Sequence, residues 1–276
     1  MTHKLIVNAD DYGHTSGVSE GIRQAHLRGI VTSTTAMMNR PAAVDELGVA
    51  QALCPRLGLG VHLVLTTGIP VLPAAKVSTL VDAVGRFNRR DQLIERLGQI
   101  NLDQVDAEWH AQVELFIKTT GKNPDHLDSH HHSSYFSPAL FERMLRLAAE
   151  LRCSIRNPFA DVNNTATDYL PGGQPDEDQK AVDALLYKFD PKRPQRFFAN
   201  FYDEGATLSH LEEILRQTSE SAEGQLCELM CHPAVVTEEL RQISDYSDTR
   251  GVELTVLTDP KVKALLKDLE IELVTF

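Results

Sequence analysis

Cysteine is scarce in this sequence, with four in 276 residues, at positions 54, 153, 227 and 231. They lack the dense spacing of a disulfide framework, which excludes a small scaffold held together by disulfide bonds. Cys227 and Cys231 stand four residues apart beside His232, so a zinc site has to be considered there. Because both fall on one side of an alternating, strand-like run, we interpret them as buried reduced thiols instead.

Long hydrophobic runs and blocks of basic residues are also missing. No apolar run approaches the roughly 20 residues that span a membrane, and the N-terminal one is too short for the core of a signal peptide. We therefore expect a cytoplasmic protein with no membrane partner. The formal net charge is −12 and no lysine or arginine block offsets it, which argues against nucleic acid as a partner.

The sequence alternates short apolar runs with amphipathic segments of helical period. This pattern predicts strands at residues 4–9, 33–38, 57–65, 126–129, 154–156, 196–201, 226–231 and 271–276. It predicts helices at residues 19–27, 42–53, 91–100, 103–119, 138–151, 207–217, 248–257 and 260–267. Alternation without a break in composition predicts one domain over residues 1–276. Seven or eight strands favour a distorted, TIM-barrel-like (β/α) barrel of the α/β class, with an open doubly wound sheet as the alternative.

Two segments, residues 68–89 and residues 163–178, show no clean period. The first is rich in Pro, Val and Gly, and the second in Gly, Pro, Asp and Thr. We interpret both as long loops, and the first as a loop of the active site.

Polar clusters occur at or near the carboxyl ends of several predicted strands, where (β/α) barrels gather their catalytic groups. Asp10 and Asp11 follow the first apolar run, and His232 ends a run near the C-terminus. A bend at the end of the first strand would bring both aspartates to one cavity, with one as a metal ligand and the other as a proton acceptor. His62 lies inside the third run, where a lone histidine is more often a core residue than a ligand.

The densest cluster is a run of seven internal residues that holds four histidines and one aspartate. Imidazole is the commonest side-chain metal ligand, so the run predicts one wall of a metal site. If the strand continues, His126, Asp128 and His130 share one face, while His131 and His132 face substrate or solvent. Asp128 would then orient a metal-bound histidine from behind.

Three further positions carry weaker signals. Arg156 follows a short apolar run and would pair with a buried carboxylate, with a solvated arginine as the alternative. His232 precedes Pro233, and its imidazole titrates near neutral pH, which suits a general acid. Tyr135 packs in a core by default, but an aromatic face beside a polar site also suits stacking on a sugar ring. We expect the remaining histidines on the surface or on helices: His3, His14, His26, His110 and His210.

Five motifs, taken in order, give the sequence its clearest signature. They are residues 6–13 (IVNADDYG), 29–35 (GIVTSTT), 60–63 (GVHL), 126–132 (HLDSHHH) and 230–233 (MCHP). As an ordered set that covers nearly the whole chain, they resemble the YdjC-like carbohydrate deacetylases, which include chitooligosaccharide deacetylases.

This resemblance implies a distorted (β/α) barrel and one divalent metal ion, zinc or magnesium. Matched position by position, Asp11, His62 and His130 would be the metal ligands. Asp10 would be the general base and His232 the general acid. With two imidazoles and one carboxylate, such a site leaves positions open for water and substrate.

The same match makes Arg156 the arginine that orients the base, which completes the catalytic set. Substrate-binding or supporting roles are expected for Asp128, His131, His132 and Tyr135. Residues 133–135 read Ser-Ser-Tyr where many relatives carry a Val-His pair. That departure bears on the choice of substrate more than on metal binding.

The implied reaction is the metal-dependent hydrolysis of N-acetyl groups from acetylated amino sugars, with short chitooligosaccharides as substrates and acetate as a product. One alternative is a metal-dependent hydrolase of another amide or ester. Another is a metal- and sugar-binding protein without turnover, against which the complete acid–base set argues. A homodimer is the expected oligomeric state, because many enzymes are symmetric oligomers.

Overall fold

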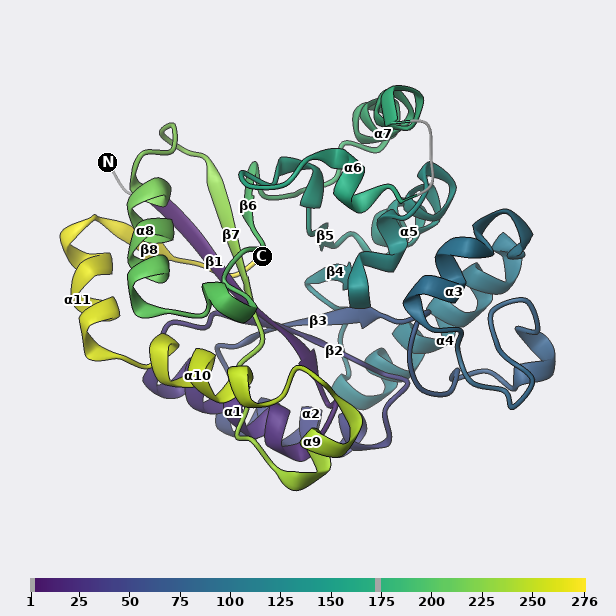
Figure 1. Ribbon diagram of the computed structural model, residues 1–276, viewed down its shortest axis with the longest axis horizontal. Helices are drawn as coiled ribbons and strands as arrows, with labels where there is room; N and C mark the ends of the chain where they lie inside the picture. Colours follow the sequence, from purple (N-terminus) through teal and green to yellow (C-terminus); the bar gives the residue numbers. More distant parts are fainter. Residues whose placement is uncertain (1–2, 172–174) are drawn as a thin grey trace.

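A parallel sheet forms the centre of the fold (Figure 1). The computed structural model describes residues 3–171 and 175–276. Within them, strands pair in the order β5-β4-β3-β2-β1-β7-β6, and β8 joins β1. The strands are β1 (His3–Tyr12), β2 (Ser33–Ala36), β3 (Gly58–Leu63), β4 (His126–Ser129), β5 (Ser154–Ile155), β6 (Arg196–Phe198), β7 (Leu226–Cys231) and β8 (Ile271–Leu273).

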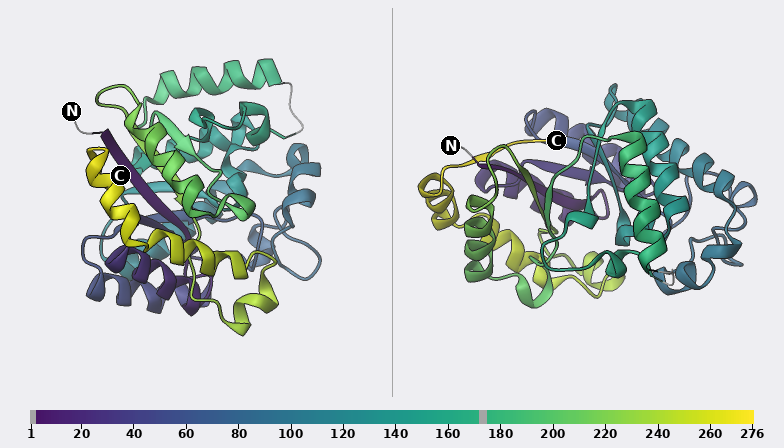
Figure 2. Two further views of the ribbon diagram at one scale, coloured as in Figure 1. Left: turned by 60° about the vertical axis from the view of Figure 1, so that its left-hand side comes forward. Right: turned by 90° about the horizontal axis from the view of Figure 1, so that it is seen from above.

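The sheet curls into a distorted barrel, and the helices pack around it (Figure 2). Strands β1 to β5 are neighbours in chain order, while β7 and β6 lie on the other side of β1, which is the order of a barrel. The ends β5 and β6 form no ladder within the described residues; one parallel bridge, between Asp161 and Phe197, lies near them. The predicted barrel-like fold is therefore confirmed, as an incompletely closed barrel.

Eleven α-helices lie within the described residues. They are α1 (Ser16–Arg28), α2 (Pro41–Leu53), α3 (Arg90–Glu95), α4 (Leu102–Thr120), α5 (Pro138–Leu151), α6 (Ala166–Tyr169), α7 (Pro175–Phe189), α8 (Leu208–Ser219), α9 (Glu238–Ile243), α10 (Asp248–Leu257) and α11 (Pro260–Asp268). Two of them begin at predicted caps: the side chains of Ser137 and Thr207 accept hydrogen bonds from backbone N–H groups of α5 and α8. No helix of the described part is long and apolar enough to cross a membrane.

Helices α7 and α9 were not predicted, and the loop expected at residues 163–178 is wrong in part. Helix α6 lies inside that range and α7 begins at Pro175, while residues 172–174 lie outside the described part. Proline at a first helical position followed by acidic residues is a helix-start signal. The Gly and Pro content of the preceding residues favoured a loop prediction over this helix-start signal.

The other predicted loop, residues 68–89, is confirmed apart from a short 3₁₀ turn at Ala74–Lys76. Helix α4 anchors it, because the buried Glu108 carboxylate accepts the backbone N–H groups of Val71 and Leu72 at 2.8 and 3.0 Å. The loop is thus fixed to the barrel at its base.

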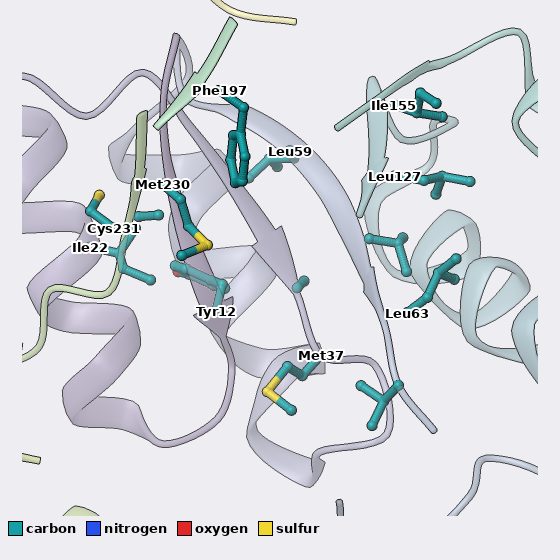
Figure 3. Close-up of a cluster of buried hydrophobic side chains, with 14 of the residues drawn as sticks. Tyr12, Ile22, Met37, Leu59, Leu63, Leu127, Ile155, Phe197, Met230 and Cys231 are labelled. Carbon is teal, nitrogen blue, oxygen red and sulfur yellow. The ribbon is translucent and has the colours of Figure 1, made fainter. Parts of the chain in front are cut away.

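The hydrophobic core joins the strands to the helices (Figure 3). Leu59, Leu127 and Phe197 come from three strands, and Ile22 comes from α1. Every residue of β1 from Leu5 to Tyr12 is buried, as expected for a parallel strand with both faces covered. Cys227 and Cys231 are buried free thiols, as predicted.

Candidate active site

A pocket of about 730 Å³ lies over the carboxyl ends of β1, β4 and β7. Asp10, Asp11, His62, His130 and His232 all line it. Residues that are far apart in the sequence therefore meet at one place because parallel strands present the same ends on one side of the barrel.

Asp10 and Asp11 reach this pocket together because β1 is irregular at its end. Pairing with β2 shifts register between Ala9 and Tyr12, and Asp11 has a left-handed φ of 72°. In a regular strand the two side chains would point to opposite faces. The bend that the sequence led us to expect is present and brings both carboxylates to one cavity.

Asp11, His62 and His130 converge on a single point. Asp11 Oδ1 lies 3.0 Å from His130 Nδ1 and 3.4 Å from His62 Nε2. One donor atom from each residue lies within 4.8 Å of the others, so the group could hold a metal ion. The side chains of Asp11 and His62 are 2% exposed and that of His130 is 12% exposed. The predicted ligand set is thus assembled as a buried cluster.

A second group of Asp10, His62 and Asp128 also meets the distance criterion for a metal, but its donors are occupied. Asp128 Oδ1 lies 2.6 Å from His62 Nδ1, and its Oδ2 accepts from Thr35 at 3.0 Å. Both oxygens of Asp10 accept from Arg156 at 2.7 Å. Asp128 instead serves behind His62, fixing its ring so that Nε2 faces Asp11.

The charges around the ligand cluster suit a cation. Burial alone would lower the pKa of His62, but Asp128 and Asp11 raise it to about 10. A metal ion bound at Nε2 would take the place of the proton that these carboxylates favour on the ring. Asp11 Oδ2 accepts a 2.6 Å hydrogen bond from Arg250, which leaves Oδ1 as the oxygen directed at the two imidazoles. Burial would raise the pKa of Asp11, yet Arg250 and His130 hold it well below its usual range.

Asp10 is held in place by the fully buried guanidinium of Arg156. Arg156 is fully buried, grips both oxygens of Asp10, and also contacts Asp128 at 2.9 Å and Glu228 at 2.7 Å. Burial would raise the pKa of Asp10, but the Arg156 guanidinium keeps it below its ordinary value. Arg156 is thus the charge partner that one of the two sequence interpretations expected.

His232 stands at the end of β7, with its Nε2 3.9 Å from Asp10 Oδ2. Its backbone N–H donates to Glu253, a fully buried carboxylate on α10. Burial lowers the pKa of His232 to about 4. The imidazole is therefore held close enough to Asp10 for a proton to pass between them through a small movement or a water.

The histidine run divides into three environments. The strand ends at Ser129, so the predicted alternation does not continue; His130 begins a 3₁₀ segment (His130–Tyr135) and reaches Asp11 from there. His126 turns away and stacks on Phe276 with ring centroids 3.9 Å apart. His131 and His132 line the pocket, both with left-handed backbone, at φ 54° and 57°.

Tyr135 takes the core position that the sequence suggested by default: it is fully buried, and its hydroxyl donates to the backbone carbonyl of Arg156 at 3.0 Å. Its ring does not line the pocket, which excludes the alternative of stacking on a sugar ring. One prediction for a single residue is wrong. His14, expected on the surface or a helix, lines the pocket three residues after Asp11. Burial lowers the pKa of His14 to about 3.

The sequence interpretation missed the contribution of α10 and the residues around it. Arg250 and Glu253 contact Asp11 and His232 from a helix more than 200 residues away from Asp11. Tyr246 donates to Glu253 at 2.5 Å, and Tyr202 stacks on Tyr246. Nothing in the spacing of Arg250 and Glu253 marks them, because α10 looks like an ordinary helix in the sequence, and the two tyrosines lie outside it.

The fold and the pocket define an enzyme of the (β/α)-barrel class. Residues 4–268 match the protein family described as YdjC-like protein, and the chain belongs to that family. A carbohydrate deacetylase of Enterococcus faecalis is 34% identical over 267 residues, covering 96% of this chain and 94% of that protein. A chitooligosaccharide deacetylase of Salmonella paratyphi B is 35% identical over 271 residues, covering 97% and 96%. The crystal structure of an Enterococcus faecalis V583 protein, 34% identical, superposes with a TM-score of 0.86 and covers 100% of this chain and 98% of that one.

Proposed function

We propose that this protein is a metal-dependent carbohydrate deacetylase that removes N-acetyl groups from amino sugars, with short chitooligosaccharides as its substrates. The observation that carries the proposal is the buried Asp11, His62 and His130 cluster beside the Asp10–Arg156 pair. The names of the relatives, carbohydrate and chitooligosaccharide deacetylases, support the class of substrate.

The ion would be held by Asp11, His62 and His130, and two imidazoles favour zinc or a similar transition metal over magnesium. A divalent ion in such a site supplies a Lewis acid that polarises a carbonyl and makes water a better nucleophile. The hydrogen bond from Arg250 to Asp11 Oδ2 would keep that ligand in place.

The residues around the cluster would carry the protons. Arg156 keeps Asp10 ionised and fixed, so Asp10 accepts the proton of the attacking water. His232 Nε2 lies 3.9 Å from Asp10 Oδ2, so a proton taken up by Asp10 has a short path to the imidazole. His232 then protonates the departing sugar amine. The C–N bond of the acetamide breaks, the water oxygen joins the acetyl group, and acetate and a free amino sugar leave.

The test is acetate release from N-acetylglucosamine, di-N-acetylchitobiose and longer oligomers, on protein loaded separately with zinc and with magnesium. Asp10→Asn should lower kcat by a factor of about 10²–10⁴ while the bound ion is unchanged, since Asp10 moves a proton and does not hold the ion. Asp245→Asn, at an exposed carboxylate of the same pocket, is the matched control and should retain activity.

Each contrary result has a distinct meaning. Loss of the ion in Asp10→Asn would reverse the roles of Asp10 and Asp11. Turnover of other amides or esters only would overturn the substrate class. Absence of turnover with every substrate, in protein that holds its ion, would overturn the enzyme proposal.

A further inference from the structure

Tyr202 presents an exposed aromatic ring at the wall of the pocket. Eleven large hydrophobic side chains are exposed within the described residues. Two of these eleven also line the pocket: Tyr202, whose exposed fraction is 42%, and Ile243, whose exposed fraction is 50%. Leaving large apolar side chains in water is unfavourable, and at a concave site they commonly serve a ligand. The position of Tyr202 therefore indicates that its ring contacts a ligand bound in the pocket.

The ring of Tyr202 is rigidly supported from one side. It stacks on Tyr246 with ring centroids 4.1 Å apart and planes 18° from parallel. The Tyr246 hydroxyl donates to Glu253 at 2.5 Å and accepts the backbone N–H of Asp203 at 3.0 Å. The guanidinium of Arg250 lies 5.4 Å from the centre of the Tyr246 ring. Tyr202 is thus the outermost layer of a fixed stack.

This stack ends beside the group that would protonate the amine. The ring centroids of Tyr202 and His232 are 5.4 Å apart, with planes at 70°. Glu253 joins the two, because it binds the Tyr246 hydroxyl with one oxygen and the His232 backbone N–H with the other. A flat apolar group resting on Tyr202 would therefore have its polar substituents next to the imidazole.

We propose that Tyr202 is the stacking platform for the pyranose ring that carries the acetamido group. The C–H face of a pyranose is apolar and packs well on an aromatic ring, while its hydroxyl and amide groups point outward. Stacked there, the sugar would place its C2 nitrogen toward His232. This role, which the sequence suggested for Tyr135, belongs to a residue outside all five sequence motifs. The proposal rests on the proposed function and adds the residue that orients the sugar.

The test measures the kinetics of active variants and, separately, the sugar affinity of a variant that does not turn the sugar over. Tyr202→Ala should raise KM for di-N-acetylchitobiose about 3- to 10-fold, the range expected for loss of one stacking contact. Tyr202→Phe keeps the ring and should keep KM, with kcat changed less than twofold. Tyr187→Ala removes a tyrosine that is 90% exposed on α7 and does not line the pocket, so it serves as the matched control.

Calorimetric titration of di-N-acetylchitobiose into the Asp10→Asn variant, with and without Tyr202→Ala, measures affinity directly. The affinity should fall by the same factor as KM rises. Equal affinity with and without the ring overturns the stacking proposal alone. Failure of every variant to bind an acetylated sugar overturns the stacking and the proposed function together. A fall in kcat with unchanged KM and affinity assigns Tyr202 to support of His232 instead, which also overturns the platform.

Discussion

Removal of Arg156 is the perturbation whose cost the structure defines best. This guanidinium is fully buried and makes four short contacts, two to Asp10 and one each to Asp128 and Glu228. Arg156→Met keeps much of the side-chain volume but leaves three carboxylates in a buried site without their shared cation. Breaking a buried ion pair by removing one partner costs about 3–5 kcal/mol. For a protein of this size, that corresponds to a fall in Tm of roughly 6–20 °C.

The loss should depend on pH with a definite sign. In the wild type, Arg156 depresses the pKa of Asp10, so this stabilisation is present above the unfolded-state pKa and is lost as the pH falls through the folded-state pKa. In Arg156→Met, burial without a cation raises the pKa of Asp10 and Glu228, so the destabilisation is relieved when these two groups take up protons. Burial already raises the pKa of Glu228 to about 7 with Arg156 present. The stability difference between wild type and variant should therefore shrink from pH 8 to pH 5.

The assay is thermal and denaturant unfolding at pH 5, 6, 7 and 8, with chelator present so that bound metal does not contribute. Arg146→Met is the matched control: its exposed pair with Glu142 along α5 should contribute less than about 1 kcal/mol. Arg156→Lys keeps the charge but not the two-pronged contact, so it should fall between wild type and Arg156→Met. A change in Tm below about 2 °C, or an equal loss at pH 5 and pH 8, would refute the reasoning.

Two other predictions concern the ligand cluster and the pocket loop. His130→Ala should weaken zinc binding by a factor of about 10 or more, measured by competition with a chromophoric chelator. His131→Ala is the control and should leave the zinc affinity nearly unchanged. Equal zinc affinities of the two variants would remove His130 from the ligand set. Glu108→Ala leaves two backbone N–H groups of the loop at residues 68–89 without their acceptor and should destabilise the protein by about 1–3 kcal/mol. Faster amide hydrogen exchange at Val71 would accompany it, and unchanged exchange there would contradict the anchoring role; the exposed Glu114→Ala should have no such effect.

Local signals predicted most of the elements correctly. The strand at residues 126–129 and the helix that follows Ser137 were predicted with their observed bounds, because apolar period and cap chemistry act over a few residues. Helix α7 was missed because its start lies in a segment whose Gly and Pro content resembles a loop. The clustering of Asp11, His62 and His130 was predicted from strand ends and family motifs together.

The residues that were missed depend on contacts between distant parts of the chain. Arg250 reaches Asp11 across 239 positions, and no local pattern encodes that distance. His14 was misplaced because a side chain's direction depends on the exact backbone bend, here the left-handed Asp11 three residues earlier. The sequence pattern thus predicted which strand ends form the pocket more reliably than it predicted which side chains point into it.

At the pocket residues with left-handed backbone, activity and thermal stability favour different side chains. Asp11, His131 and His132 are non-glycine residues at positive φ, a backbone conformation that costs about 1 kcal/mol or more at each position, and all three line the pocket. Glycine would remove that cost and the functional side chain at the same time. A laboratory selection for heat resistance alone would therefore accept glycine at His131 and His132, whereas glycine at Asp11 would also leave the buried Arg250 guanidinium without its carboxylate, at a cost that exceeds the strain relieved.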